Sequence, residues 1–264
     1  MATMNDTAFS AVPRRRWRRG MLSLLGLLPL ALLLLVWQLV QQGPSPYFPR
    51  PSLWADALVK LAVTGKLWPA LWATVQTFLE SLVIATLLGS VLGMLIGRRR
   101  RIAQTTGPLF EFFRVIPAAA VVPVAVLFGG YTESMKIVVV VFAAIWPVLL
   151  TVQSGARRLP AARDDLARSM RLTRWQAVWK VLVPSMVPSI LLGVRVAAPI
   201  VLIIVLLVEI ITQVPGLGAL LASGQQNYQA AQVFGIVAIS GILGLLTNLL
   251  VTAVEAVATR YESR

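Results

Sequence analysis

The 264-residue chain contains no histidine and no cysteine. These two residue types supply most ligands for transition metals, and they also provide thiol nucleophiles and imidazole acid–base groups. Their absence removes the usual transition-metal sites and thiol chemistry. It also leaves no basis for inferring a redox compartment. We therefore predict no metal site, no cofactor in this chain and no catalytic residue.

Charged residues are scarce, at 13% of the sequence, while 58% of the residues are apolar. The mean hydropathy is +0.79. A soluble domain is closer to about 45–50% apolar and about 25% charged. Because one helical membrane span takes about 20 apolar residues, six or seven spans fit this length. The composition thus predicts an all-α membrane protein.

Six apolar segments are long enough to be considered as spans. The first, residues 21–40, exceeds the apolar core of a signal peptide and no small-x-small cleavage pattern comes after it, so we interpret it as a retained span. The other five are expected at about 72–96, 109–128, 137–152, 187–211 and 233–257. Residues 1–20 form a basic N-terminal segment, residues 21–264 the transmembrane domain, and residues 155–186 a cytoplasmic loop within it.

The connection between the first two predicted spans is rich in proline and tryptophan. Ser52 is placed to cap a short helix that carries Trp54, Leu58 and Leu61 on one side. A short helix of this kind is expected at the outer membrane interface.

Basic residues are distributed unequally between the two sides of this six-span scheme. The predicted inner segments hold 5, 4, 7 and 2 of them, a total of 18, and the outer segments hold 4. The positive-inside rule then places both termini in the cytoplasm. The net charge of +14 is spread over several inner loops, which argues against a nucleic-acid partner.

Four residues within the predicted spans are candidates for a translocation pathway: Glu80, Pro117, Pro123 and Glu209. Acids in a span are costly, and broken backbone is tolerated where it lines a cavity or packs on protein. The alternative for Glu80 is a packed or hydrated acid near the outer interface. For Glu209 it is a carboxylate that packs spans or pairs across a dimer. An acid in the pathway would disfavour an anionic solute.

A charged stretch at residues 163–184 interrupts the apolar runs and must lie in water. Leu166 and Met170 are four residues apart, which places them on one face of a short helix. Thr173 and Gln176 have the spacing of a capping box, so a second helix is expected to begin there. Trp175 continues at helical spacing, and Pro184 is expected to end the segment.

This stretch resembles the cytoplasmic coupling loop, or EAA loop, of permease subunits in bacterial ATP-binding-cassette importers. Asp165, Leu166 and Ala167 stand where that family has Glu-Ala-Ala, and Arg171 stands where it has glycine. The pair 183–184 falls at the family's final apolar-Pro pair. The glycine allows a left-handed turn, so Arg171 either accepts the cost of that conformation or the first helix bends differently.

Two further motifs are similar to the nitrate, sulfonate and taurine group of these permeases. One is Arg-x-x-Pro-x5-Pro, formed by Arg114, Pro117 and Pro123. The other is Glu209 with Gly-Leu-Gly after it at residues 216–218. The resemblance extends over about residues 25–258, and these two motifs and the coupling loop support it.

The resemblance implies a type I importer permease in the bacterial inner membrane, which forms the solute pathway as a homodimer. Its implied partners are two cytoplasmic ATPase subunits, which hold ATP and Mg²⁺, and an extracytoplasmic solute-binding protein. Leu166 and Met170 are the expected ATPase contacts, with Arg168 and Arg174 as rim charges. The alternative is an ATP-independent secondary transporter or channel. A membrane-bound enzyme is not indicated, because the sequence shows no cluster of acid, base and nucleophile.

Overall fold

The computed structural model describes residues 26, 28–41, 43, 45–159 and 168–262, and these residues form helices and no strand. The chain divides into two compact units at Pro44 and Ser45. The described part of the first unit contains α2 (Leu28–Val40), an apolar 13-residue helix within the predicted first span. The second unit contains all the other described helices, and the prediction of an all-α fold is confirmed.

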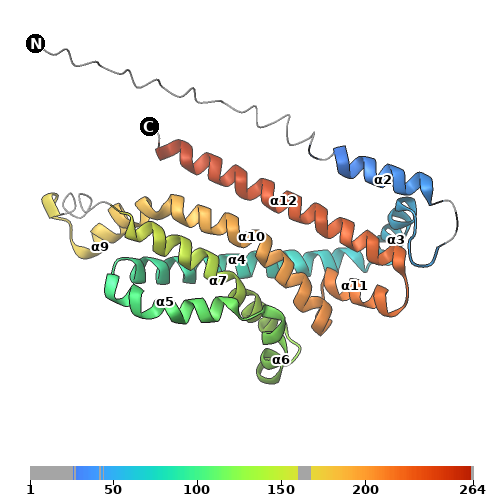
Figure 1. Ribbon diagram of the computed structural model, residues 1–264, viewed down its shortest axis with the longest axis horizontal. Coiled ribbons are helices and arrows are strands. Elements are labelled where there is room, and N and C mark those ends of the chain that lie inside the picture. The colour runs from blue at the N-terminus through green and yellow to red at the C-terminus, as the bar shows by residue number, and fades with distance from the viewer. Residues whose placement is uncertain (1–25, 27, 42, 44, 160–167, 263–264) are drawn as a thin grey trace, which may run out of the picture. The chain divides into compact units, whose positions relative to one another are not determined.

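Among the described residues, four helices are long and apolar enough to cross a membrane. Each contains one of the predicted spans and extends beyond it at both ends (Figure 1). They are α4 (Leu67–Gly97), α7 (Glu133–Arg157), α10 (Val183–Thr212) and α12 (Ala230–Glu262).

The core of the second unit lies where α4, α7 and α10 pack together. It is built from small and β-branched side chains that are fully buried. Examples are Ala85, Val139, Val140, Ala144, Val201 and Val205.

Three glycines of α4 let it lie very close to α7. A Cβ at Gly93 would stand 2.8 Å from the carbonyl oxygen of Leu149, and one at Gly97 would stand 2.7 Å from Cβ of Ala156. One turn earlier, a Cβ at Gly89 would stand 2.9 Å from Cβ of Val148. Small residues four positions apart form one stripe, which permits this backbone approach between membrane helices.

The predicted span at 109–128 is two helices in the structure. α5 (Arg100–Val115) and α6 (Ala118–Gly129) are bent by 88° relative to each other. The break falls at Ile116 and Pro117, because the proline ring disfavours helical backbone in the residue before it. Ile116 is accordingly extended, with φ −61° and ψ 119°. The backbone break expected in this proline-containing span therefore lies at Pro117, and α6 continues through Pro123.

A short helix, α3 (Pro51–Val63), precedes α4 and packs on α12. Trp54 is buried and stacks on Phe234 of α12, with ring centroids 5.1 Å apart. The expected cap at Ser52 is wrong, because the helix begins one residue earlier at Pro51. Proline suits the first helical position, since its fixed φ matches the helix and its missing N–H leaves no donor unpaired.

The segment before α10 is helical without a gap. α9 (Arg174–Ala177) passes into a π-helical turn, η1 (Val178–Leu182), and η1 passes into α10. The prediction that Pro184 ends this segment is therefore wrong, because Pro184 lies in the first turn of α10. The wider turn of a π-helix already interrupts the regular hydrogen-bond ladder, so the missing N–H of proline is tolerated there.

Candidate functional site

The described part of the predicted coupling loop begins at Arg168; Asp165, Leu166 and Ala167 lie outside the described residues. Thr173 and Gln176 form the predicted capping box. The Gln176 N–H donates to Thr173 Oγ1 at 3.3 Å, and the Thr173 N–H donates to Gln176 Oε1 at 3.0 Å. The predicted start of a second helix at Thr173 is confirmed.

Arg171 has φ +49°, which is the left-handed region that the family's glycine would occupy without strain. Arg171 therefore adopts the left-handed conformation despite its energetic cost, which is the first of the two alternatives predicted for this position. The Arg171 N–H donates to the Arg168 carbonyl oxygen at 2.9 Å, so the turn is closed by a backbone hydrogen bond.

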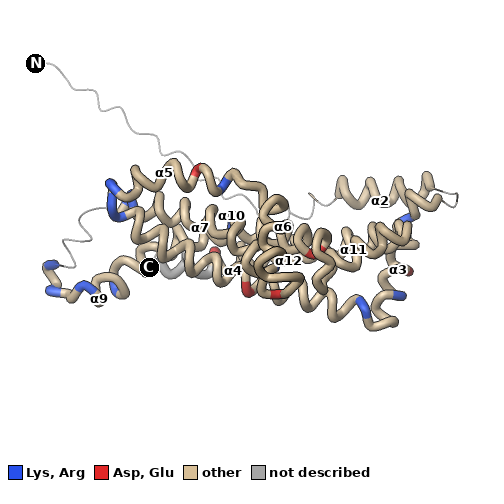
Figure 2. The backbone as a smooth tube through the Cα atoms, turned by 90° about the horizontal axis from the view of Figure 1, so that it is seen from below, with Lys and Arg blue, Asp and Glu red and all other residues tan. Residues whose placement is uncertain are grey.

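Apolar side chains project from this basic segment. Met170 is 62% exposed and Trp175 71% exposed, and the Trp175 and Trp179 rings form a T-shaped pair with centroids 5.6 Å apart. Arg168, Arg171 and Arg174 are exposed around them. Figure 2 shows basic residues, lysine and arginine in one colour, gathered at this end of the second unit, where α5 begins and α9 lies.

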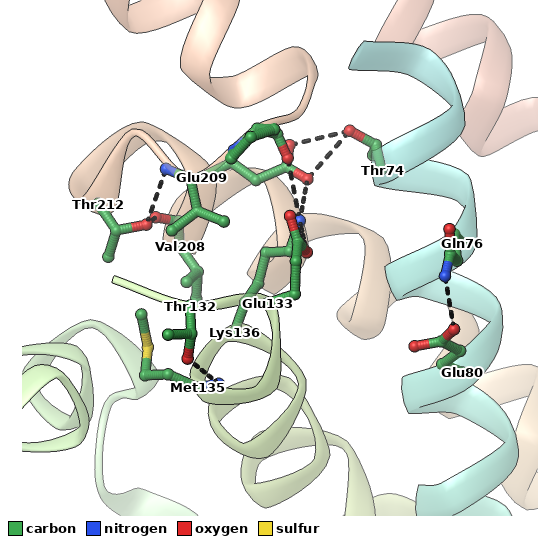
Figure 3. A network of polar contacts seen from close by, with 12 residues as sticks. Thr74, Gln76, Glu80, Thr132, Glu133, Met135, Lys136, Val208, Glu209 and Thr212 are labelled. Atoms are coloured by element: carbon green, nitrogen blue, oxygen red, sulfur yellow. Dashed lines mark hydrogen bonds and ion pairs between the residues drawn. The ribbon is translucent and has the colours of Figure 1, made fainter. Parts of the chain in front are cut away.

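A buried ion pair joins four helices away from this basic end. Glu209 of α10 and Lys136 of α7 are both fully buried, with 3.3 Å between Glu209 Oε1 and Lys136 Nζ (Figure 3). The Thr74 hydroxyl of α4 lies 3.0 and 2.9 Å from the two carboxylate oxygens. The Gly218 N–H, in the first turn of α11 (Leu217–Gln226), donates to Glu209 Oε2 at 3.0 Å.

The Lys136 ammonium group donates hydrogen bonds to Glu209 Oε1 and, at 3.1 Å, to the Pro215 carbonyl oxygen. It also forms an ion pair with Glu133 Oε2 at 2.8 Å. A buried charge is tolerated when it is paired and its hydrogen bonds are satisfied. The arrangement therefore fixes the start of α11 against α7 and α10.

The Gly-Leu-Gly motif is explained by this network. A Cβ at Gly216 would overlap the Glu209 carboxyl group, and one at Gly218 would stand 2.5 Å from the Leu206 carbonyl oxygen. The Leu217 N–H donates to Thr74 Oγ1 at 2.9 Å. Glycine is needed at both flanking positions because the chain must approach α10 without a side chain.

The four candidate pathway residues do not form one cluster. Glu80 is half-buried on α4 and accepts a hydrogen bond from Gln76 at 2.9 Å. Pro117 and Pro123 lie at the start and inside of α6. A pathway role for these residues stays a prediction. For Glu209, the buried ion pair favours the alternative in which the carboxylate packs the spans together. Because Lys136 balances its negative charge, Glu209 no longer argues against transport of an anionic solute.

The sequence does not predict that Lys136 and Thr74 belong to this network. The charge count places Lys136 among the outer-side residues, yet its side chain is fully buried. The available signal is its position three residues after Glu133 at the start of an apolar run, a spacing that permits pairing on a helix. Thr74 carries no such signal, since its partners are 135 and 143 positions away.

The long apolar helices, with one broken pair between them, define a multi-pass membrane protein. The chain belongs to the family described as binding-protein-dependent transport system inner membrane component, whose profile matches residues 85–260. It is the permease subunit of an ATP-binding-cassette importer in the bacterial plasma membrane. This confirms the resemblance, and the comparisons do not support the ATP-independent alternative.

Three curated relatives cover most of the chain. The bicarbonate transport system permease protein of Synechococcus elongatus is 27% identical over 251 residues, 89% of each chain. The taurine transport system permease protein of Escherichia coli is 27% identical, covering 96% of this chain and 94% of the relative. The putative aliphatic sulfonates transport permease protein of Bacillus subtilis is 26% identical, covering 96% and 93%.

Solved structures show the same fold. One is an amino acid ABC transporter crystallised with histidines, with a TM-score of 0.59, 17% identity, and coverage of 76% of this chain and 98% of that chain. An inward-facing methionine ABC transporter gives a TM-score of 0.51 at 19% identity, covering 72% and 98%. The type I importer fold predicted from the sequence is confirmed.

Proposed function

We propose that residues 163–184 couple this permease to cytoplasmic ATPase subunits by docking on them. The family implies partners that hydrolyse ATP and a solute-binding protein. We further propose that two copies of this chain form the pathway, that two ATPase subunits hold ATP and Mg²⁺, and that this chain performs no covalent chemistry and holds no cofactor.

The observation that carries this proposal is the continuous helical run from Arg174 to Thr212. A displacement of α9 by a docked ATPase is transmitted directly into a membrane span, because no loop intervenes to absorb it. The capping box fixes the first turn of that run. A stiff connection of this kind is required for a mechanical lever.

The contact surface consists of an apolar centre with a charged rim. Met170 and Trp175 are exposed apolar side chains, and an exposed apolar group beside arginines is typical of the centre of a protein interface. Leu166 is one helical turn before Met170 in the sequence and is assigned to the same contact. Arg168 and Arg174 supply the rim charges.

The direct test is a pull-down of tagged chain from detergent-solubilised native membranes. We expect wild type to recover an ATPase in stoichiometric amounts and Leu166→Asp/Met170→Asp to lose it while the chain stays folded. Thr105→Asp is the matched control, because it adds a charge to exposed α5 surface without removing an apolar contact. Recovery of the chain without any ATPase, under conditions that preserve importer complexes, contradicts the proposal.

Arg171 provides a second variant in the same assay. We propose that its guanidinium donates hydrogen bonds to the ATPase surface, which offsets the cost of the left-handed backbone. Arg171→Gly relieves that cost, about 1–2 kcal/mol, so the chain should be at least as stable as wild type. ATPase recovery and coupled ATP hydrolysis should nevertheless fall. If both stay at the wild-type level, Arg171 does not contact the partner.

A further inference from the structure

A cavity of about 290 Å³ lies between α5 and α7. It is on the side of these helices nearest the arginine run at residues 98–101, since Gln104 of α5 and Arg157 of α7 both line it. The charge count assigns this end of the helices to the cytoplasm. Phe110 and Leu150 contribute apolar wall, and polar and charged side chains complete much of the lining.

Gln153 is the buried polar group in this cavity. This residue is only 6% exposed, and it borders the cavity. A side-chain amide can both donate and accept hydrogen bonds. The amide of Gln153 is therefore placed to bind a ligand that enters the cavity.

The charges around Gln153 sum to +1. Arg114 pairs with Glu111 at 3.2 Å, and that pair is partly exposed. Arg157 also lines the cavity, and within the described part of the chain it has no acidic partner. The cavity thus presents one unpaired guanidinium, a second one shared with Glu111, and the amides of Gln104 and Gln153.

We propose that this cavity binds a small oxyanion group, such as a phosphate or sulfate, through Arg157, Arg114 and the Gln153 amide. A guanidinium presents parallel N–H donors that match two oxygens of a tetrahedral anion, and hydrogen bonds to ionised groups are the strong ones. Glu111 limits the affinity by repelling the anion and by occupying Arg114.

The oxyanion that binds this cavity has two candidate sources. One is a free anion that enters from the aqueous side. The other is the phosphate of an acidic lipid, because basic pockets between membrane helices on the cytoplasmic side bind such headgroups. The proposal concerns the binding site within one subunit, so it does not rest on ATPase docking at residues 163–184.

The experiment uses the full chain in nanodiscs, together with any ATPase that purifies with it, in two arms. In phosphatidylcholine alone, equilibrium binding of labelled phosphate and of labelled sulfate is measured. In nanodiscs that also contain phosphatidylglycerol, bound lipid is counted by native mass spectrometry. Saturable binding at one site per chain is expected in the first arm for a free anion and in the second arm for a lipid headgroup.

Three variants identify the site. Arg157→Gln should weaken binding about tenfold or more, since a hydrogen bond to a charged group contributes about 1.5–3 kcal/mol. Glu111→Gln should strengthen it, because it removes the competing carboxylate. Arg158→Gln is the matched control: it deletes the same charge at the next position, where the side chain lines a different groove between α7 and α10.

Two results overturn the proposal. One is the absence of saturable binding in both arms. The other is equal weakening by Arg157→Gln and Arg158→Gln, which would mean that the basic end attracts anions without a specific site. Because Arg157 is exposed, its variant is expected to keep the wild-type unfolding midpoint, which is measured alongside.

Discussion

Lys136 shows how a single buried charge depends on its neighbours. Its ammonium group is fully buried and is satisfied by Glu209, Glu133 and the Pro215 carbonyl oxygen. Glu209 lies in the last turn of α10, and Pro215 lies between α10 and α11. The stability of the α10–α11 connection is therefore tied to this one side chain.

Replacing Lys136 by methionine should lower the free energy of unfolding by about 3–5 kcal/mol, because Glu209 is left buried without its cation. Denaturation of the purified chain in detergent measures the change. Lys136→Met combined with Glu209→Gln should lose less than the sum of the two single variants, since the pair is already broken in each.

Lys66→Met is the matched control for this residue. Lys66 is exposed at the start of α4, so the same change should alter stability by no more than about 0.5 kcal/mol. A Lys136→Met variant as stable as Lys66→Met would show that the buried pair does not stabilise the fold.

Among the helices, the packing of α4 on α7 is set by the glycine stripe at Gly89, Gly93 and Gly97. Gly93→Ala places a Cβ 2.8 Å from the Leu149 carbonyl oxygen and 2.9 Å from Cβ of Val152. Forcing extra volume into a packed contact costs about 1–3 kcal/mol. We expect a lower thermal unfolding midpoint for this variant in detergent.

The control for that change is Gly241→Ala in α12. Nothing lies within 4 Å of the added Cβ, so the substitution should be neutral or stabilise the helix by up to about 1 kcal/mol. If Gly93→Ala and Gly241→Ala shift the midpoint alike, glycine is not required for close approach between α4 and α7.

For the molecule as a whole, the distribution of arginine and lysine predicts which way the chain crosses the membrane. α4 has Lys66 before its first turn, and Arg99 lies just beyond its last turn. Its 31 residues extend about 46 Å at 1.5 Å per residue, enough to cross the hydrocarbon core. The two positions should therefore lie on opposite sides.

Because the chain has no cysteine, single-cysteine variants report this topology without background labelling. Lys66→Cys should react with a membrane-impermeant maleimide added to intact spheroplasts. Arg99→Cys should react only after the membrane is permeabilised. The unsubstituted chain is the control, and the reverse pattern would contradict a cytoplasmic location for the arginine-rich end.

Much of the architecture can be predicted from local features. The apolar runs of α4, α7, α10 and α12 are long enough to identify each span, and the capping box at Thr173 and Gln176 gives a helix start. Helix boundaries are harder to predict because they depend on neighbouring packing. The first turn of α3 begins at Pro51 instead of after Ser52, and η1 carries the helix past Pro184.

The class of this protein can be read from the chain in order, since hydrophobic length, charge asymmetry and motif spacing are all local properties. The role of Glu209 cannot, because Thr74, Lys136 and Gly218 reach it from three other helices only through packing. The same holds for the 88° bend between α5 and α6. Proline marks where a helix breaks, but the tertiary contacts on either side set the direction of the next helix.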